Sequence, residues 1–458
     1  MSLTQPKKWK IWSYATLIFC LGAYTLLLLS WERGSLTVER YALPVAFAFF
    51  GAAVCRGGVR GEVWAGPLFL LWFVVSRMLL GENYLETSSL DFALMVPAYL
   101  VALPFAFSQE GEQRKRGLRV FCWFISLSAS ALAWVGVATA MTRGDITLPV
   151  FGTHFYLARY QLFSFGAYPN MGAAYYLIGL MTLGYLVLTV RKKWMILPAV
   201  VMGAGLWAAT AFSVCRTVMI QWAAMLAGMT LMLCLRCKKV RGVAKTVLTV
   251  VLVLAVALGT YKSFSWVSQA AMRQNAQNPL IARAYAEEET APTPAPGSET
   301  ISTRPLDLKT VLTLTDRNKI FSACFELIKN KPQVLLHGVL TKDIYREIGP
   351  YMTLPDGIVY YHAHNAWLQA LVNVGLPGLL LALYMTWMAV RSGWRILFHR
   401  PAGQTPLAEC WLGFCCPALL LGGITEPFLF TDVFPIGCIC FMLLLGYALH
   451  TEKQVMAR

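Results

Sequence analysis

The chain has 458 residues, of which 57 % are hydrophobic and only 14 % are charged. A soluble domain is roughly 25 % charged and 45–50 % apolar, so this composition excludes a soluble enzyme, a disordered protein and a disulfide-rich secreted module. It predicts an all-α polytopic membrane protein. The net charge of +16 would suggest nucleic-acid binding in a soluble chain. Here the distribution of the charges indicates membrane topology instead, and we expect no nucleic-acid partner.

Apolar runs that approach the roughly 20 residues of a membrane-spanning helix recur along the chain. Twelve are predicted, with the runs at 41–55 and 245–260 shorter than the others: 11–31, 41–55, 64–80, 90–107, 118–141, 171–190, 194–215, 217–235, 245–260, 366–390, 409–430 and 431–449. The pattern is interrupted once, by a long polar connection. We therefore expect three parts, with spans in 1–260, one large and partly helical loop at 261–365, and spans again in 366–458.

Basic residues predict the orientation of these spans, because cytoplasmic loops carry an excess of Lys and Arg. With the N-terminus inside, the interior segments hold 22 Lys and Arg, whereas the shorter exterior loops hold five. An even number of spans then places both termini in the cytoplasm. It also places the loop at 261–365 on the exterior face.

Two exterior loops are candidates for function. In the long loop, apolar residues recur at helical spacing from Leu306 to Lys331, which predicts one or two amphipathic helices that cap the bundle. A structured loop of this length is more often functional than idle. The second loop, at about 142–170, contains His154 and Arg159 and is the next candidate.

A pair of histidines marks the point where the long loop re-enters the membrane. His362 and His364 directly precede an apolar run that Asn365 is suited to cap. An imidazole has an ordinary pKa of about 6.5 and accepts a proton at neutral pH. The alternative is an interfacial pair that belongs to the aromatic belt of the membrane.

Arg216 lies in a tight turn, Ser213–Thr217, between two apolar runs on the exterior side. A charged side chain at that depth costs free energy and needs an anionic partner, and the short turn contains no Asp or Glu. A lipid diphosphate is one such partner, because Arg binds phosphate through bidentate hydrogen bonds. The alternative is a side chain that extends to the lipid headgroups.

Two further charged residues have two interpretations each, and a third, Arg77, has two candidate partners. Arg317 lies on the predicted amphipathic helix and is either a second phosphate contact or a locally paired surface charge. Glu426, near the exterior end of its run, either orients a His or an Arg or forms a structural salt bridge. Arg77, inside the run at 64–80, is suited to pair with Glu82 or Glu86.

These residues resemble a known family of membrane enzymes. His364, Asn365, Leu368 and Gly375 are similar to the H-N-x-x-L-x6-G signature of the O-antigen ligase and Wzy-type polymerase superfamily. The turn around Arg216 and the loop helix around Arg317 resemble the two arginine elements of that family. The resemblance covers about 210–380, and the N-terminal half matches only in hydropathy.

The resemblance implies an inverting GT-C glycosyltransferase that uses neither a metal nor a cofactor. The implied donor is a glycan on undecaprenyl diphosphate, and the implied acceptor is a hydroxyl of a glycan or a lipid at the outer face of the bacterial inner membrane. His364 would take the proton of the acceptor hydroxyl. Two further groups of residues are implied: the donor diphosphate would be held by Arg216, Arg317 and Lys319, and the groups that orient His364 or bind sugar would be Asn365, His362, Glu426, Arg159 and His154.

Three questions stay open at this stage. A polymerase and a ligase for a surface polysaccharide such as lipopolysaccharide differ only in the acceptor, which is another lipid-linked repeat, lipid A–core or a protein hydroxyl. The sequence does not distinguish these acceptors, although a surface polysaccharide is slightly favoured over a protein. A transporter or flippase of the lipid-linked glycan also suits twelve spans, although transporters usually show internal repeats and interrupted helices at the midplane. A non-catalytic assembly scaffold is a further class of function that stays open, after the transferase and the transporter.

Overall fold

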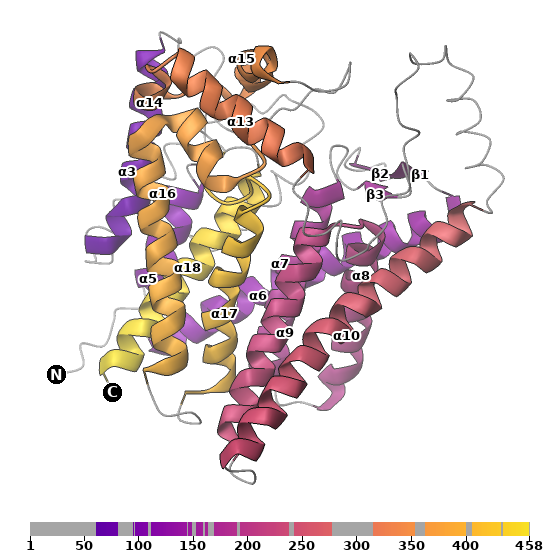
Figure 1. Ribbon diagram of the computed structural model, residues 1–458. Helices are drawn as coiled ribbons and strands as arrows, with labels where there is room; N and C mark the ends of the chain where they lie inside the picture. The colour runs from indigo at the N-terminus through magenta and orange to yellow at the C-terminus, as the bar shows by residue number, and fades with distance from the viewer. Residues whose placement is uncertain are drawn as a thin grey trace.

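A computed structural model shows a bundle of long helices covered at one end by a smaller cap (Figure 1). The structure describes the following residues: 61–80, 95, 97–108, 111–143, 145–148, 153–158, 161–163, 169–189, 193–237, 242–276, 315–352, 362–399, 405–431 and 434–457. Helices dominate these residues, which confirms the predicted fold class in its coarse form. The expected runs at 11–31 and 41–55 lie outside the described residues.

Among the described residues, those from 61 to 276 supply seven helices of the bundle. Several of them begin or end in a short 3-10 or π segment. Their bounds are η1 Gly61–Trp64 leading into α3 Ala65–Leu79, η2 Pro97–Ala102 leading into α5 Leu103–Ser108, α6 Gly111–Ala138 leading into η3 Thr139–Arg143, α7 Pro169–Thr189, η4 Lys193–Met195 leading into α8 Ile196–Phe212, α9 Arg216–Arg236 and α10 Gly242–Ala276. α10 extends well past the apolar run expected at 245–260.

The second part forms the cap and completes the bundle. The cap elements are α13 Thr315–Asn330, α14 Val334–His337, η5 Thr341–Asp343, α15 Ile344–Ile348 and η6 Gly349–Tyr351. The bundle helices are α16 Ala366–Phe398, α17 Leu407–Gly423 and α18 Pro435–Ala457. The apolar face of α13, which includes Ile320, Cys324 and Leu327, is buried against the start of α16. One amphipathic helix is therefore confirmed within the predicted stretch 306–331, over the described residues Thr315–Asn330.

Seven of the described helices are long and apolar enough to cross a membrane, and three shorter apolar helices accompany them. Together they coincide with the ten expected runs that fall on described residues. The predicted total of twelve spans is not established, since two of the runs are not described.

A small antiparallel sheet lies between α6 and α7, where the sequence analysis expected only a loop. It has the order β1 Asp145–Leu148, β2 Thr153–Ala158 and β3 Gln161–Phe163. Phe155 of β2 and Leu162 of β3 are fully buried beneath it. The described residues therefore contain a small sheet in addition to the predicted helices.

The helix α16 folds back on itself near its beginning. Gly375 has φ 76° and ψ −173°, which interrupts the helix two residues before Pro377. The indole nitrogen of Trp367 donates to the hydroxyl of Thr386 over 2.8 Å, although 19 residues separate the two along the chain. Nineteen residues of straight helix would span about 28 Å. Residues 366–374 therefore run antiparallel to residues 376–398, and the span expected at 366–390 begins only after Gly375.

This hairpin is held at its tip by close backbone contacts with the cap. A Cβ added at Gly375 would collide with the carbonyl oxygen of Leu336, and one added at Gly338 would collide with the backbone of Asn373. The fully buried Arg77 of α3 ties the two segments together by donating to the carbonyls of Val339 at 3.0 Å and Asn373 at 3.1 Å. Arg77 thus has backbone acceptors, whereas Glu82 and Glu86 lie outside the described residues.

The opposite end of the bundle is joined by ion pairs. Arg391 of α16 contacts Glu62 at 2.6 Å and Glu452 of α18 at 3.0 Å, and Arg395 contacts Glu452 at 2.7 Å. These pairs tie the first described helix, α16 and α18 together at the end far from the cap (Figure 1). By the predicted topology this is the cytoplasmic end.

Candidate active site

The beginnings of four helices meet at one short loop, Ile424–Glu426, which follows α17. Thr217 in the first turn of α9 and Thr425 share a hydrogen bond of 2.6 Å. Asn365, which precedes α16, donates to the carbonyl of Ile424 at 2.9 Å. Asn170 in the first turn of α7 and Arg317 in the first turn of α13 both donate to Glu426, the last residue of this loop. Each helix N-terminus carries partial positive charge, so their convergence favours an anion nearby.

Glu426 is the side chain that connects these elements. Its Oε1 accepts hydrogen bonds from Nη2 of Arg317 at 2.8 Å and from Nδ2 of Asn170 at 2.7 Å. Its Oε2 lies 3.6 Å from Nδ1 of His364. The Glu426 side chain is only 2 % exposed, whereas that of Arg317 is 30 % exposed. Glu426 therefore forms a salt bridge with Arg317 and also faces His364.

Burial alone would raise the pKa of Glu426, since it disfavours the charged carboxylate. The contact with His364 and the positive charges of His364 and Arg317 outweigh burial and lower the pKa below its ordinary value. Glu426 is therefore an anion at neutral pH. It provides a fixed negative charge between the histidine and the arginine.

His362 and His364 lie against each other, with ring centroids 4.0 Å apart. Burial, and then the charge of His364, lower the pKa of His362 to about 3. His362 is therefore a neutral ring at physiological pH. Nδ1 of His364 in turn lies 3.6 Å from Oε2 of Glu426.

Asn365 caps α16 as predicted. Its Oδ1 accepts from the backbone N–H groups of Trp367 at 3.0 Å and Leu368 at 2.9 Å. Its Nδ2 donates to Ile424, so one amide fixes both the helix start and the loop that carries Glu426. Asn365 thereby sets the position of the histidine directly before it.

Backbone strain is concentrated beside the same loop. Among the described residues, the non-glycine residues with positive φ are Val214 at 52° and His364 at 51°. Such a conformation costs on the order of 1–3 kcal/mol and is typical of functional sites. Val214 lies in the turn that precedes Arg216, the first residue of α9. Val214 and His364 are thus both held in strained conformations, each within three residues of a side chain that bonds to Ile424 or Thr425.

Three further predicted residues lie on other parts of the chain. Lys319 is exposed on α13, about 200° around the helix from Arg317. His154 lies on β2, where its backbone pairs with Thr147 of β1. Arg159 lies outside the described residues.

Asn170 is the residue that sequence reasoning missed. It is the second residue of α7 and donates to Glu426, which lies 256 positions later in the chain. A polar residue at the start of an apolar run carries no motif, because helix beginnings favour Asn for local reasons. The one available signal was its position at the exterior end of a predicted span.

Residues 215–383 match the family model for O-antigen ligase. The resemblance to the O-antigen ligase family is therefore confirmed over this segment. The matched O-antigen ligase segment contains Arg216, Arg317 and His364, and it ends before Glu426. A search of curated proteins found no match to this chain.

Proposed function

We propose that this O-antigen ligase-type protein is an inverting membrane glycosyltransferase. It moves a glycan from a polyprenyl diphosphate, in bacteria undecaprenyl diphosphate, to an acceptor hydroxyl. The observation that carries this proposal is the position of Glu426, which links Arg317 to His364 through one buried carboxylate. A phosphate-binding group and a proton acceptor are thereby held side by side.

The diphosphate of the donor is bound by Arg317 and Arg216. Nη2 of Arg317 donates to Glu426, and a guanidinium has five N–H donors in all, so one guanidinium can contact both Glu426 and a phosphate. Arg216 is the first residue of α9, one residue before Thr217 in the contact with Thr425. The converging helix beginnings add their dipoles to the same region. These charges stabilise the negative charge that develops on the leaving diphosphate.

His364 is the base that activates the acceptor. Nδ1 faces Glu426, and in this proposal Nε2 accepts the proton of the acceptor hydroxyl. The hydroxyl oxygen forms a bond to the anomeric carbon as the bond from that carbon to the diphosphate oxygen breaks. Glu426 stabilises the imidazolium that results, as the carboxylate of a catalytic triad does. The lipid diphosphate departs with the electron pair.

His362 and Asn365 support this step. The neutral ring of His362 packs on His364 and excludes water from one side of it. Asn365 fixes the backbone that follows. In this proposal Lys319, His154 and Arg159 contribute at most to sugar or phosphate binding at the periphery. The chemistry requires neither a metal nor a cofactor.

The site lies at the end of the bundle that carries the cap, opposite the ion pairs of Arg391 and Arg395 (Figure 1). The distribution of basic residues supports a topology in which the cap side is extracytoplasmic and both termini are inside. We therefore propose that transfer occurs at the outer face of the bacterial inner membrane. The acceptor is a growing glycan or a lipid such as lipid A–core.

Incubation of the purified protein with a lipid-linked glycan and candidate acceptors tests the proposal. A ladder of products identifies a polymerase, and a single block added to a foreign acceptor identifies a ligase. If the protein only moves the donor between the leaflets of a vesicle and forms no new glycosidic bond, it is a transporter and the proposal is wrong.

A further inference from the structure

Two buried amide side chains lie next to the histidine pair. Gln369 and Asn373 are four residues apart on the short first section of α16 (366–374), and both are fully buried. Residues at this spacing share one face of a helix, and Nε2 of Gln369 donates to Oδ1 of Asn373 over 3.2 Å. Leu371 and Val372 of the same section belong to the apolar core beneath the cap. A polar group buried in such surroundings costs free energy unless it is hydrogen-bonded, so the other partners of these amides indicate their role.

Gln369 holds the turn that carries the histidines. Its Oε1 accepts a hydrogen bond of 2.6 Å from the backbone N–H of Ala363, the residue between His362 and His364. Ala363 is itself fully buried. On the other side of His364, the side chain of Asn365 is bonded to the loop that follows α17. The backbone is therefore held by an amide side chain on each side of His364.

The conformation of His364 is one that needs this support. Its φ of 51° is strained for a residue with a side chain, and such a conformation persists only where the surrounding structure holds it. The backbone conformation sets the direction of the imidazole, whose Nδ1 lies 3.6 Å from Oε2 of Glu426. The bond from Ala363 to Gln369 restricts the same turn. Without that bond, the turn would relax and carry the ring away from Glu426.

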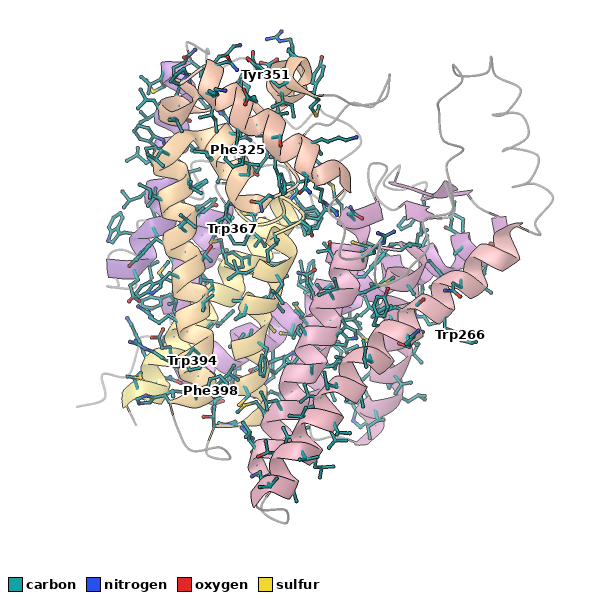
Figure 2. All side chains as sticks on the ribbon, in the orientation of Figure 1. Trp266, Phe325, Tyr351, Trp367, Trp394 and Phe398 are labelled. Atoms are coloured by element: carbon teal, nitrogen blue, oxygen red, sulfur yellow. The ribbon has the colours of Figure 1, made fainter. Side chains whose placement is uncertain are left out.

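Asn373 anchors Gln369 to the cap. Nδ2 of Asn373 donates to Oγ1 of Thr341 over 2.7 Å, and its backbone carbonyl accepts from Arg77 over 3.1 Å. Trp367, two residues before Gln369, lies beside the long second section of α16 (Figure 2). Because two residues are about 200° apart around a helix, Gln369 is directed to the opposite side. The short section is therefore held by the long section on one side and by the turn and the cap on the other.

We infer that Gln369 is a positioning residue for His364 and that Asn373 is its anchor. The inference rests on the proposed function, since it assigns a support to the base of that reaction. Gln369 has no exposed surface through which to contact a glycan or a lipid. It acts through the backbone of Ala363, which sets the direction of the His364 ring.

Gln369→Met tests this role, because methionine has a similar length but offers Ala363 only a weak acceptor. Turnover of a polyprenyl diphosphate-linked glycan should fall by about 10- to 100-fold, the loss expected when a reacting group is displaced by about 1 Å or less. Binding of undecaprenyl diphosphate should stay as in the wild type, because Arg216 and Arg317 are unchanged. The expected pattern is a loss in kcat without a loss in donor affinity.

Two further variants complete the comparison. Asn373→Leu removes the anchor but leaves the Gln369 oxygen as an acceptor, so it should lose less turnover than Gln369→Met. This second variant also tests the inference if Gln369→Met does not fold. Gln454→Met is the matched control, because Gln454 also contacts a side chain four residues away, that of His450, but on α18. It should transfer as the wild type does.

A spectroscopic readout tests the inference without requiring transfer. In protein with carbon-13-labelled histidine rings, the magnetic resonance signal of His364 is assigned by its loss in His364→Ala. This signal should shift or divide in Gln369→Met, because the turn is no longer held in one conformation. It should be unchanged in Gln454→Met.

The results separate this inference from the proposed function. If the wild type forms no glycosidic bond, the proposed function is wrong, and the His364 signal still decides whether Gln369 positions the ring. An unchanged signal in both Gln369→Met and Asn373→Leu overturns the inference. A fall in donor affinity by the same factor as turnover also overturns it, since that would show a merely structural role. A changed His364 signal in a variant that still binds undecaprenyl diphosphate supports it.

Discussion

Oε2 of Glu426 lies 3.6 Å from Nδ1 of His364, although the two residues lie 62 positions apart and are separated by the folded-back helix α16 and the apolar helix α17. The separation is longer than an ordinary hydrogen bond. It suits a pair that tightens when the imidazole gains a proton. The other carboxylate oxygen, Oε1, accepts hydrogen bonds from Arg317 and Asn170, and these bonds fix the direction in which Oε2 points.

Glu426→Gln should reduce the transfer rate by about 100- to 10 000-fold, the range that loss of an orienting carboxylate produces. Gln has a similar shape but does not stabilise the imidazolium. Turnover measured at saturating donor and acceptor provides the readout. Glu347→Gln on α15, which removes a glutamate paired with Lys331, is the matched control. Equal loss in both variants would show that the effect is structural.

Asn170→Asp should impair transfer more than Asn170→Ala. Alanine removes one hydrogen bond to Glu426 and allows the carboxylate to move, whereas aspartate places a like charge 2.7 Å from it. Like charges raise the pKa of a carboxyl, so aspartate opposes the ionised form of Glu426. The predicted order in turnover is wild type, then alanine, then aspartate, with the acid limb of the pH profile moved upward in the aspartate variant. An aspartate variant as active as the wild type would exclude this positioning role.

His362→Gln should weaken the loss of thermal stability on acidification. The pKa of His362 is about 3 in the folded protein, whereas an unfolded histidine titrates near 6.5. Between these pH values only the unfolded state binds the proton, so stability is full above pH 6.5 and falls as the pH decreases. The slope approaches about 1.4 kcal/mol per pH unit for one such group. Melting temperatures between pH 7.5 and 5 should fall less in the variant, and parallel curves would contradict the neutral buried ring.

Gly375→Ala should destabilise the protein by more than about 1–2 kcal/mol and reduce transfer. Gly375 has φ 76°, and its missing side chain faces the backbone of Leu336. Alanine disfavours this backbone conformation and would push the cap away from the hairpin. The fold-back places His364 at the site, so distortion at the tip should be transmitted to it. Gly259→Ala on α10, where no atom lies within 4 Å of the added Cβ, is the control. A fully active and stable Gly375→Ala variant would show that the tip does not define the site.

The local features of the fold were predictable from the sequence because they depend on neighbouring residues. Apolar runs located the described helices of the bundle, and the apolar face of α13 followed from the spacing of Ile320, Leu327 and Ile328. The cap by Asn365 followed from its residue type. Gly375 is the last residue of the motif that begins at His364. Its consequence was not predicted, because a reversal of the chain inside one continuous apolar run leaves no change in composition.

The long-range contacts of the site were less accessible to sequence reasoning. Glu426 was predicted to orient a His or an Arg, but nothing in the sequence selected Arg317 and His364 as its joint partners. Asn170 carried no signal, since its role depends on packing between α7 and the loop after α17. The small sheet at 145–163 was missed because its strands are short and lie between two strongly apolar runs.

The most direct measurement compares wild-type protein and His364→Ala in a purified transfer assay with a polyprenyl diphosphate-linked glycan and an acceptor. Donor binding and melting temperature are measured on the same samples. The account predicts that His364→Ala still folds and binds the lipid diphosphate but forms no new glycosidic bond. Transfer at the wild-type rate by His364→Ala would contradict the assignment of His364 as the base.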